Sequence, residues 1–593
     1  MPLIPQCLRA IRFPTLKECA VLVSLVALYV FGAAFVINGD GSYAYAMLEK
    51  MADPGAFASN DLTIKGNIEG NFLFYRLLFY LPFFSHNFVF WDFAISSVLS
   101  ILLLLAWYNV FLEFSGRRVV ATTALGLLLF VDARLSLGGT TLPLFYLTSI
   151  ASVLFAQTFA LFFFIRGSPI FSFALLSLTT YFHPPSGLFF LAVLGLFLLI
   201  QSVKEHRYRT LVYAVGIAAI IFLPNAVLIS HRIGFSGDTK LFFEVFRALS
   251  GPHAGHNYVE SYWQAYVMSL ASWLLVLVAL PKIQFSSQSK KTIQWIIGLS
   301  FLVVGLGLIN LYFFHYLQIF YLYFAMRSTY LLKPLFVFLF VVIAFDLHSK
   351  RTVTSLCAAG CLLASLFIPS LVWSLAVLFV AFVYLFFDIE GQSWAIRFNA
   401  AIGSFLTQRL IRVFQFLFLL ILCAGIFLFL YNHNNKLQKV FRLFQGENTF
   451  NFSFRPEKNF GLNNASPALG EVIDWAKQDK GKMFITPPDN CGFSFFRFIA
   501  KNSVYTNVCD VFQLNYTPVY FLQAYDRFLS LDVRYIGWGQ AFDYSGYNVL
   551  NLMDIRTRNE ADFIIFDKTS IGYWQRPETP VFENNQFIIY SLR

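Results

Sequence analysis

Charged residues are scarce in this sequence. Only 13% of its 593 residues are Asp, Glu, Lys or Arg, whereas about a quarter is usual for a soluble globular protein. Apolar residues make up 58% of the chain, Phe alone occurs 73 times, and the mean hydropathy is +0.64. These proportions exclude an ordinary soluble enzyme and indicate a polytopic membrane protein, so length is a poor guide to the number of domains.

The sequence also lacks the motifs of several functional classes. The net charge is +11, but no zinc-finger spacing, basic helix or RNA-binding signature accompanies it. We therefore assign the Lys and Arg residues to short cytoplasmic loops and expect no nucleic-acid partner. No G-x-G-x-x-G follows a predicted strand, which argues against a nucleotide site. No small-residue cleavage site ends the first apolar run, so it is expected to remain as a membrane span.

Cysteine is sparse and forms no disulfide framework. Four of the seven cysteines lie in apolar stretches, where cysteine is usually a small buried hydrophobe: Cys19, Cys357, Cys361 and Cys423. Cys491 and Cys509 lie in the polar C-terminal region, and they can pair only if that region is in an oxidising compartment.

Long apolar runs fill the first part of the chain. These apolar runs predict about thirteen spans in the inner (plasma) membrane. If the basic clusters lie in the cytoplasm, the N-terminus is inside and the C-terminus is outside. The spans are expected at 18–37, 88–113, 119–132, 147–165, 169–182, 186–203, 210–230, 263–281, 293–314, 333–348, 353–369, 371–388 and 411–431. The outside loops, 38–87, 133–146, 231–262 and 315–332, are long. Long loops tend to be functional, so we expect the working face outside.

Residues 72–84 are the ambiguous segment of this topology. Their sequence, FLFYRLLFYLPFF, is too short to span comfortably and predicts a helix at the outer interface. If the segment spans, the orientation of everything after it inverts.

The composition divides the chain into two domains, a multi-span domain at 1–431 and a soluble extracytoplasmic α/β domain at 432–593. In the second domain, helices are expected at ASPALGEVIDWAKQ, with Ser466 as N-cap, at FSFFRFIAKN and at VYFLQAYDRFLSL. Strands are expected at KMFITPP, SVYTNV, ADFIIFDK and NQFIIYSLR. This order predicts a small sheet with helices packed on it.

Two acids of the first outer loop are candidate functional residues, since ionisable groups at the mouth of a span are costly to bury. Asp40 lies in a Gly-Asp-Gly turn in NGDGSYAYAMLEK. It either ends the first span or takes a proton from a hydroxyl at the membrane surface. Asp61, in ASNDLT, either caps the next helix or supplies a second carboxylate.

Histidines in two later loops are candidates for contact with anions. His183, in YFHPPSGLFF, is either an interfacial side chain or a partner for a phosphate. Arg247, His253 and His256 share the loop FRALSGPHAGHNY. The two histidines suggest either a metal site or contact with an anionic lipid head. Lipid contact is favoured, because no helix aligns them as metal ligands.

In FAMRSTYLLKP, Arg327 precedes the tenth predicted span and Lys333 is its first residue. One interpretation is that they anchor the helix at the interface by extending to the headgroups. The other is that they clamp a phosphate, for which the guanidinium offers a two-pronged donor.

The arrangement resembles the GT-C superfamily of integral-membrane glycosyltransferases over nearly the whole chain. Residues 40–61, DGSYAYAMLEKMADPGAFASND, are similar to the first-loop pattern of that family, in which an Asp and a nearby Tyr precede a helix ending in a Pro/Gly turn. HPPSGLFFLAVL and FITPP…FSFFRFIAKNSVYTN resemble segments of a bacterial branch.

The resemblance implies transfer of a sugar from a polyprenyl-phosphate-linked donor to a glycan, lipid or protein acceptor outside the cytoplasm, usually with inversion. Asp40 would be the catalytic base, with Tyr43 nearby, and Arg327, His183 and His256 would steady the lipid phosphate. The predicted substrate-binding set is completed by Asp61, Arg247, His253 and Lys333. The family commonly pairs its Asp with a second acid, but Gly41 stands there in this chain. We therefore assign no metal ligand, and a divalent cation remains an option.

Two alternatives stay open. A lipid-linked glycan polymerase or ligase of another fold would use the same outer cations without needing Asp40. A transporter or flippase of lipid-linked sugars would show mid-span charges and symmetry between halves, and the sequence displays neither.

Overall fold

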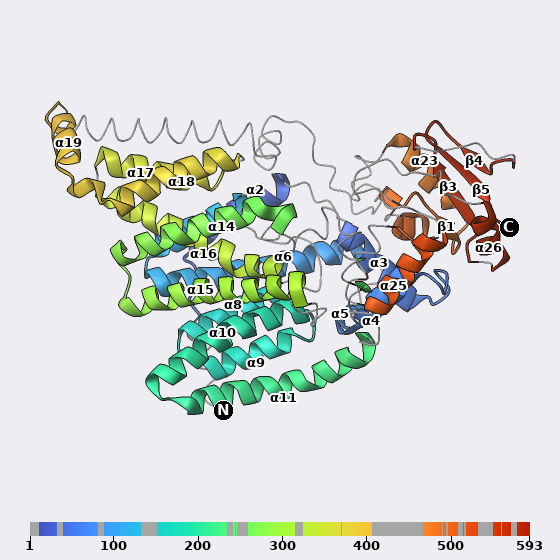
Figure 1. The fold of residues 1–593 in the computed structure, drawn as a ribbon, viewed down its shortest axis with the longest axis horizontal. Coiled ribbons are helices and arrows are strands. Elements are labelled where there is room, and N and C mark those ends of the chain that lie inside the picture. The colour runs from blue at the N-terminus through green and yellow to red at the C-terminus, as the bar shows by residue number, and fades with distance from the viewer. Residues whose placement is uncertain are drawn as a thin grey trace.

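The structure is a computed structural model. It describes residues 11–32, 39–70, 72–80, 88–131, 151–233, 241–242, 245, 259–314, 324–350, 352–368, 370–405, 466–488, 490, 492–493, 496–507, 514, 517–531, 549–558, 560–570 and 578–593. Figure 1 shows a bundle of helices on one side and a small sheet with its helices on the other.

The bundle is built from helices that share one apolar core. Its helices are α2 (Leu16–Gly32), α6 (Phe88–Ser115), α7 (Arg118–Phe130), α8 (Ala151–Ile165), α9 (Pro169–Thr179), α10 (Pro184–Glu205), α11 (Tyr208–Ile233), α14 (Val259–Ala279), α15 (Ser287–Ile309), α16 (Phe324–Ser349), α17 (Val353–Ser365) and α18 (Leu371–Phe386). Helix α19 (Ser393–Phe405) follows α18 and contacts α17. Among the described helices long enough to cross a membrane, α16 is the most enclosed, with 89% of its apolar window buried. A helix enclosed by protein on all sides can carry polar groups that lipid would not tolerate.

Among the described residues, six helices are long and apolar enough to cross a membrane. They are α6, α10, α11, α14, α15 and α16. Shorter apolar helices lie where the sequence predicts the spans 119–132, 147–165, 169–182, 353–369 and 371–388. The predicted span 411–431 lies outside the described residues, so the count of about thirteen stays a prediction.

One predicted boundary is wrong. Helix α16 begins at Phe324, so Arg327 belongs to the helix instead of the loop predicted at 315–332. The polar residues Arg327, Ser328 and Lys333 lower the local hydropathy, and Pro334 is unusual inside a helix. These features hide the helix start from a hydropathy argument.

The first outer loop folds into three short helices, α3 (Gly39–Ala52), α4 (Leu62–Gly70) and α5 (Phe72–Phe79). The eight described residues of α5 cover about 12 Å, far less than a hydrocarbon core of about 30 Å, so this stretch alone is too short to span. Asp40 is the second residue of α3 and starts this helix, whereas the sequence predicted a turn there. A carboxylate suits the first turn of a helix because the helix dipole is positive there.

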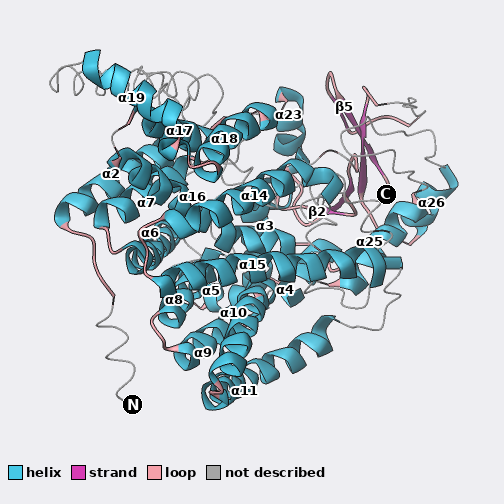
Figure 2. Cartoon of the chain, turned by 60° about the vertical axis from the view of Figure 1, so that its left-hand side comes forward, coloured by secondary structure: helices cyan, strands magenta, loops and turns pink. Residues whose placement is uncertain are grey.

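The C-terminal region forms a mixed five-stranded sheet of order β2-β1-β3-β5-β4. Its elements are α23 (Pro467–Ala476), β1 (Met483–Ile485), the π-helix η8 (Phe496–Ala500), β2 (Ser503–Val504), α25 (Pro518–Ser530), α26 (Val549–Thr557), β3 (Phe563–Asp567), β4 (Phe582–Glu583) and β5 (Phe587–Ser591). Strand β1 is parallel to β2 and β3, and β5 is antiparallel to β3 and β4. Figure 2 shows the strands at one end of the molecule, near α25 and α26.

Apolar side chains cover both faces of this sheet, since successive strand residues point to opposite faces. Phe484 and Ile565 pack with residues of α23 and η8, and Ile485 and Ile564 pack with residues of α26. Ser466 accepts a hydrogen bond from the amide of Leu469, which confirms the predicted N-cap. The helix predicted at FSFFRFIAKN is described only as the five-residue η8. Residues 432–465 and both candidate cysteines, Cys491 and Cys509, lie outside the described residues.

Candidate functional site

The first-loop helices cover one end of the bundle, which we call the loop-side end. Their apolar cluster, built from residues such as Met47, Ile64 and Phe74, packs against Trp91 at the start of α6 and against Phe182. Phe182 immediately precedes His183 in the turn between α9 and α10. The predicted site residues on α3, in this turn and at the start of α16 therefore belong to the same end of the bundle.

The His183 turn is held by a buried polar network. His183 is the N-cap of α10, and the amide of Ser186 donates to its Nδ1 at 3.3 Å. The hydroxyl of Ser186 lies 2.9 Å from Nδ1 and accepts a bond of 2.7 Å from Nε2 of Gln157. Gln157 also donates to the hydroxyl of Thr179 at 3.2 Å. Because a backbone amide donates to Nδ1, that nitrogen accepts, and the neutral imidazole carries its proton on Nε2.

Arg327 shares the electrostatic environment of His183. Burial and the positive charge of Arg327 together hold the pKa of His183 well below its usual range, so the imidazole is neutral at pH 7. Nη1 of Arg327 donates to the hydroxyl of Tyr330 at 3.2 Å, and the guanidinium carbon lies 5.8 Å from the centre of the Tyr330 ring. This geometry gives the guanidinium a fixed orientation.

Arg327 is 4% exposed and Lys333 is 0% exposed. A cation that reaches the headgroups by extending its side chain would be exposed at its tip, so burial argues against the interfacial-anchor interpretation for both residues. Lys333 lies about 9 Å further along the helix axis than Arg327. Buried cations within a membrane bundle are expensive and usually functional.

These groups can do specific chemistry together. A guanidinium, an ammonium and the Nε2–H of a neutral imidazole are all hydrogen-bond donors. In a buried environment such donors bind anionic oxygens far more strongly than in water. The loop-side ends of α10 and α16 thus carry groups of the kind that bind anions such as a phosphate.

The contacts of Asp61 fit one of its two predicted roles. Its Oδ1 accepts from the amide of Ile64 at 3.2 Å, so it caps α4, as one interpretation of the sequence expected. Its Oδ2 accepts a 2.8 Å bond from Nε of Arg497 in the C-terminal domain, and both side chains are buried. Both carboxylate oxygens are therefore occupied by protein donors, and these contacts give no support to Asp61 as a substrate ligand.

The remaining predicted residues are only partly described. Asp40 and Tyr43 are placed by their backbones in the first part of α3. Arg247, His253 and His256 lie outside the described residues. Within the described part of the chain, no group of three or more His, Cys, Asp or Glu side chains is arranged to hold a metal ion.

The sequence argument missed Gln157, Ser186 and Arg497. Gln157 carried a signal, since an amide within the Phe-rich run of α8 needs a partner. Ser186 and Arg497 stood in quoted motifs, but their roles depend on residues elsewhere in the chain.

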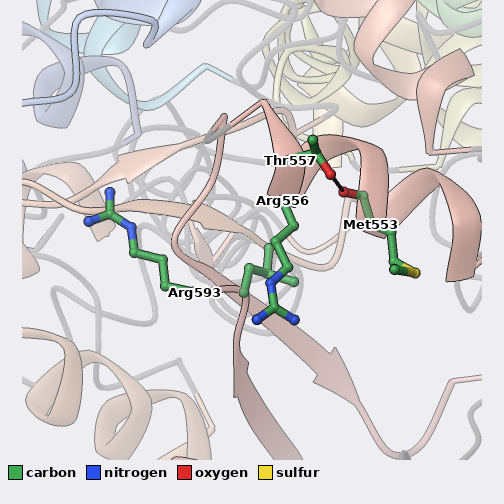
Figure 3. Close-up of a pocket in the computed structure, with 5 residues that line it drawn as sticks. Met553, Arg556, Thr557 and Arg593 are labelled. Carbon is green, nitrogen blue, oxygen red and sulfur yellow. Dashed lines mark hydrogen bonds between the residues drawn. The ribbon is translucent and has the colours of Figure 1, made fainter.

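A separate hollow lies in the C-terminal domain. It has a volume of about 720 Å³ and is lined by Met553, Arg556, Thr557, Leu592 and Arg593. In Figure 3 the Thr557 hydroxyl donates to the backbone oxygen of Met553, at 2.7 Å. Arg593 is paired with Asp562. None of the predicted site residues lines this hollow.

No family model matches this sequence, and no curated protein matches it. A solved structure, the crystal structure of ArnT from Cupriavidus metallidurans bound to undecaprenyl phosphate, aligns with 98% of this chain and 99% of that chain. The aligned residues are 12% identical and the TM-score is 0.41. At these values the likeness assigns neither an activity nor a ligand to this chain.

Proposed function

We propose that this protein is a membrane glycosyltransferase that moves a sugar from a polyprenyl-phosphate-linked donor to an acceptor hydroxyl on the outer face. The observation that carries the proposal is the burial of Arg327 and Lys333 at the loop-side end, with His183 close enough to Arg327 for its pKa to respond. A lipid phosphate approaches a binding site from within the membrane. Buried cations within a helix bundle are positioned to bind it there.

The chemistry follows from this placement. The acceptor oxygen attacks the anomeric carbon while Asp40 takes its proton, and the bond between that carbon and the phosphate oxygen breaks. The electron pair leaves with the phosphate oxygen, and the phosphate gains negative charge. Arg327, Lys333 and the Nε2–H of His183 stabilise this charge as it develops. Attack opposite to the leaving phosphate inverts the anomeric centre.

The outer location is supported by one contact and by the charge distribution. Because Asp61 and Arg497 are bonded, the first loop and the C-terminal domain lie on the same side of the membrane. Basic residues gather in turns at the other end, where Arg117 pairs with Asp346 and Arg166 with Glu113. An excess of Arg and Lys marks the cytoplasmic side, so the loop-side end is proposed to face outward.

The test is to analyse lipid extracts of a deletion strain complemented with variants. The deletion should accumulate a polyprenyl-phosphate-linked sugar, and the wild-type gene should remove it. The variant Asp40→Asn should leave the accumulation in place, with transfer reduced at least about 100-fold, because a positioned general base contributes that much. The control Asp53→Asn changes an exposed carboxylate of the same loop and should behave as wild type.

Two outcomes would contradict the proposal. If the deletion strain accumulates no lipid-linked sugar, the substrate class is wrong. If Asp40→Asn clears the compound at the wild-type rate, Asp40 is not the base. In that second case, loss of clearance in Lys333→Met would favour a ligase that uses the same cations without a carboxylate.

A further inference from the structure

The first loop and the C-terminal domain are joined by a buried ion pair between residues 436 positions apart. Nε of Arg497 donates to Oδ2 of Asp61 at 2.8 Å, and Nη2 donates to Oδ1 at 3.2 Å. The two side chains are 1% and 0% exposed. A two-pronged bond of this kind fixes direction as well as distance, and a lysine cannot reproduce it.

The surrounding backbone completes this junction. Nη2 of Arg497 also donates to the carbonyl of Val504 at 3.1 Å, and the amide of Val504 donates to Oδ2 of Asp61 at 3.3 Å. Ile64 supplies the remaining bond through its amide. One carboxylate therefore ties the start of α4 to β2 and η8, and every partner is satisfied as burial requires.

A second arginine holds the residue before Asp61. Nη1 of Arg527 donates to the carbonyl of Tyr505 at 2.6 Å, and Nη2 donates to the carbonyl of Asn60 at 2.7 Å. The guanidinium carbon lies 4.3 Å from the centre of the Tyr505 ring. The side chain of Asn60 donates in turn to the carbonyl of Glu560 at 3.1 Å. The segment entering α4 is thus fixed on the sheet domain at successive residues.

The junction extends to α3, the helix that begins with Asp40. Glu49 near the end of α3 pairs with Lys501 of the C-terminal domain. The neighbouring Lys50 donates to the carbonyls of Pro54 and Phe57, at 2.5 Å and 2.6 Å, which fixes the turn between α3 and α4. In Figure 1, α3 and α4 lie between the bundle and the sheet domain.

Because Glu49 and Asp40 belong to the same helix, anchoring Glu49 also sets the position of Asp40. Glu49 and Asp40 are nine positions apart, so about 13 Å of helix separates the anchor from the acid. A tilt of about 10° at the anchor displaces Asp40 by about 2 Å. A misplacement of about 1 Å at a reacting group can cost about 100-fold in rate.

We propose that Arg497 and Asp61 form a positioning pair, by which the C-terminal domain sets the orientation of α3 and so of the acid at its start. The proposal rests on the proposed function for the role of Asp40. It assigns the C-terminal domain a part in transfer beyond its own folding.

The first experiment compares Arg497→Lys with Arg558→Lys in purified protein. Arg497→Lys keeps the charge and loses the two-pronged bond, so kcat for transfer should fall about 100-fold while the KM for the lipid donor changes less than about twofold. Arg558 is half exposed and pairs with Asp554 on the surface of the same domain, so Arg558→Lys should keep the wild-type kcat. A wild-type kcat in folded Arg497→Lys overturns the proposal.

The second experiment is a rescue that separates positioning from folding. The amide of Ala58 donates to the hydroxyl of Ser503 at 3.0 Å, so the first loop and β2 are in direct contact at these two residues, which are chosen for a cysteine pair. Ala58→Cys with Ser503→Cys, added to Arg497→Lys, should restore kcat at least tenfold when oxidised and lose it on reduction. The single variant Ala58→Cys in Arg497→Lys is the control. If the disulfide forms without restoring kcat, the pair is not a positioning device.

The third readout does not depend on transfer. Amide hydrogen exchange of residues 39–66 should be at least tenfold faster in Arg497→Lys than in wild type, while β3 and β5 exchange as before. If wild-type protein shows no transfer but this difference is present, the proposed function fails and the anchoring of α3 stands. Unchanged exchange over 39–66 overturns the anchoring itself.

Discussion

Nε2 of Gln157 donates a 2.7 Å hydrogen bond to the hydroxyl of Ser186, whose oxygen lies 2.9 Å from Nδ1 of His183. This chain orients the imidazole from the neighbouring helix α8. The variant Ser186→Ala removes the central hydroxyl and leaves a buried amide short of a partner. The free energy of unfolding should fall by about 1–3 kcal/mol, measured by thermal or denaturant unfolding in detergent.

A matched control is Ser300→Ala. Ser300 is equally buried, but its hydroxyl donates only to the carbonyl of Ile296 within its own helix. Its loss should cost less than about 1 kcal/mol, because the carbonyl keeps its backbone bond. An equal cost for both serines would show that the network around His183 contributes nothing beyond a local bond.

The lowered pKa of His183 predicts a pH dependence of stability. Below about pH 6.5 the imidazole of the unfolded chain binds a proton that the folded protein does not accept. The unfolded state is then favoured, so stability should fall by about 1.4 kcal/mol per pH unit below 6.5, until the pKa of the folded protein is reached. His183→Asn keeps a cap acceptor and removes the titration, so its unfolding free energy should vary less between pH 7.5 and 5.

His206→Asn provides the comparison for this pH series. His206 is exposed at the C-terminal end of α10, where its φ of 52° is one that Asn tolerates. The variant should follow the wild-type pH curve. A wild-type curve for His183→Asn would instead mean that the imidazole of His183 does not cause the loss of stability at low pH.

Lys333 should be needed for transfer even though no part of it is exposed. Lys333→Met keeps the length and apolar stem of the side chain and removes the charge that would stabilise the leaving phosphate. The rate of transfer should fall about 100- to 1000-fold, the usual effect of removing one donor to a developing anion. The rate is measured in proteoliposomes supplied with the accumulated lipid-linked sugar.

Lys290→Met is the corresponding control at the opposite end of the bundle. The ammonium of Lys290 donates to the carbonyl of Pro281 in a turn at that end. Its replacement should leave the rate of transfer within about twofold, since a surface contact of this kind contributes little. Equal rates for wild type and Lys333→Met would remove the lysine from the site.

The sequence predicts the separate elements better than their partners. Short continuous apolar runs locate β3 and β5, and hydropathy locates α6, α10 and α15, since these signals are local. The pairing of Asp61 with Arg497 has no local signal, because it joins the start of α4 to η8, 436 positions away in the sequence. From the sequence alone, each of the two residues is an ordinary charged residue near the start of a helix.

The candidate site shows the same division. The sequence identified His183, Arg327 and Lys333 as unusual, because charged groups near spans are costly. It left their roles open, since exposure decides between an interfacial anchor and a buried ligand. The 0% exposure of Lys333 argues against an interfacial anchor for the lysine. Exposure depends on how α16 is enclosed by other helices, which a single sequence does not reveal.

The close approach of α4 to the C-terminal domain predicts that a side chain at Gly66 is destabilising. A Cβ at Gly66 would lie 2.4 Å from Leu514 and 2.7 Å from Thr517, both of which precede α25. Gly66→Ala should therefore destabilise the junction by about 1–3 kcal/mol through overpacking. Amide exchange in α4 and α25 would rise together, which distinguishes a shared interface from damage to one helix.

Gly470→Ala is the opposite case in the same domain. A Cβ at Gly470 meets nothing within 4 Å, and the residue lies inside α23. Alanine is favoured over glycine in a helix interior, so stability should rise by up to about 1 kcal/mol. If Gly66→Ala is tolerated as well as Gly470→Ala, α4 does not pack against the C-terminal domain in solution.

The bond between Asp61 and Arg497 also predicts which residues share a side of the membrane. In a background without native cysteines, Ser59→Cys in the first loop and Lys480→Cys in the C-terminal domain should both react with a membrane-impermeant maleimide in intact cells. Ser287→Cys, at the start of α15, should react only after permeabilisation, because the neighbouring Lys290 and Lys291 of this helix are proposed to lie on the cytoplasmic side. All three positions are exposed, so protein burial does not limit labelling. Labelling of Ser59→Cys and Lys480→Cys from opposite sides would be incompatible with a direct bond between Asp61 and Arg497. The proposal that the C-terminal domain positions α3 would then fail as well.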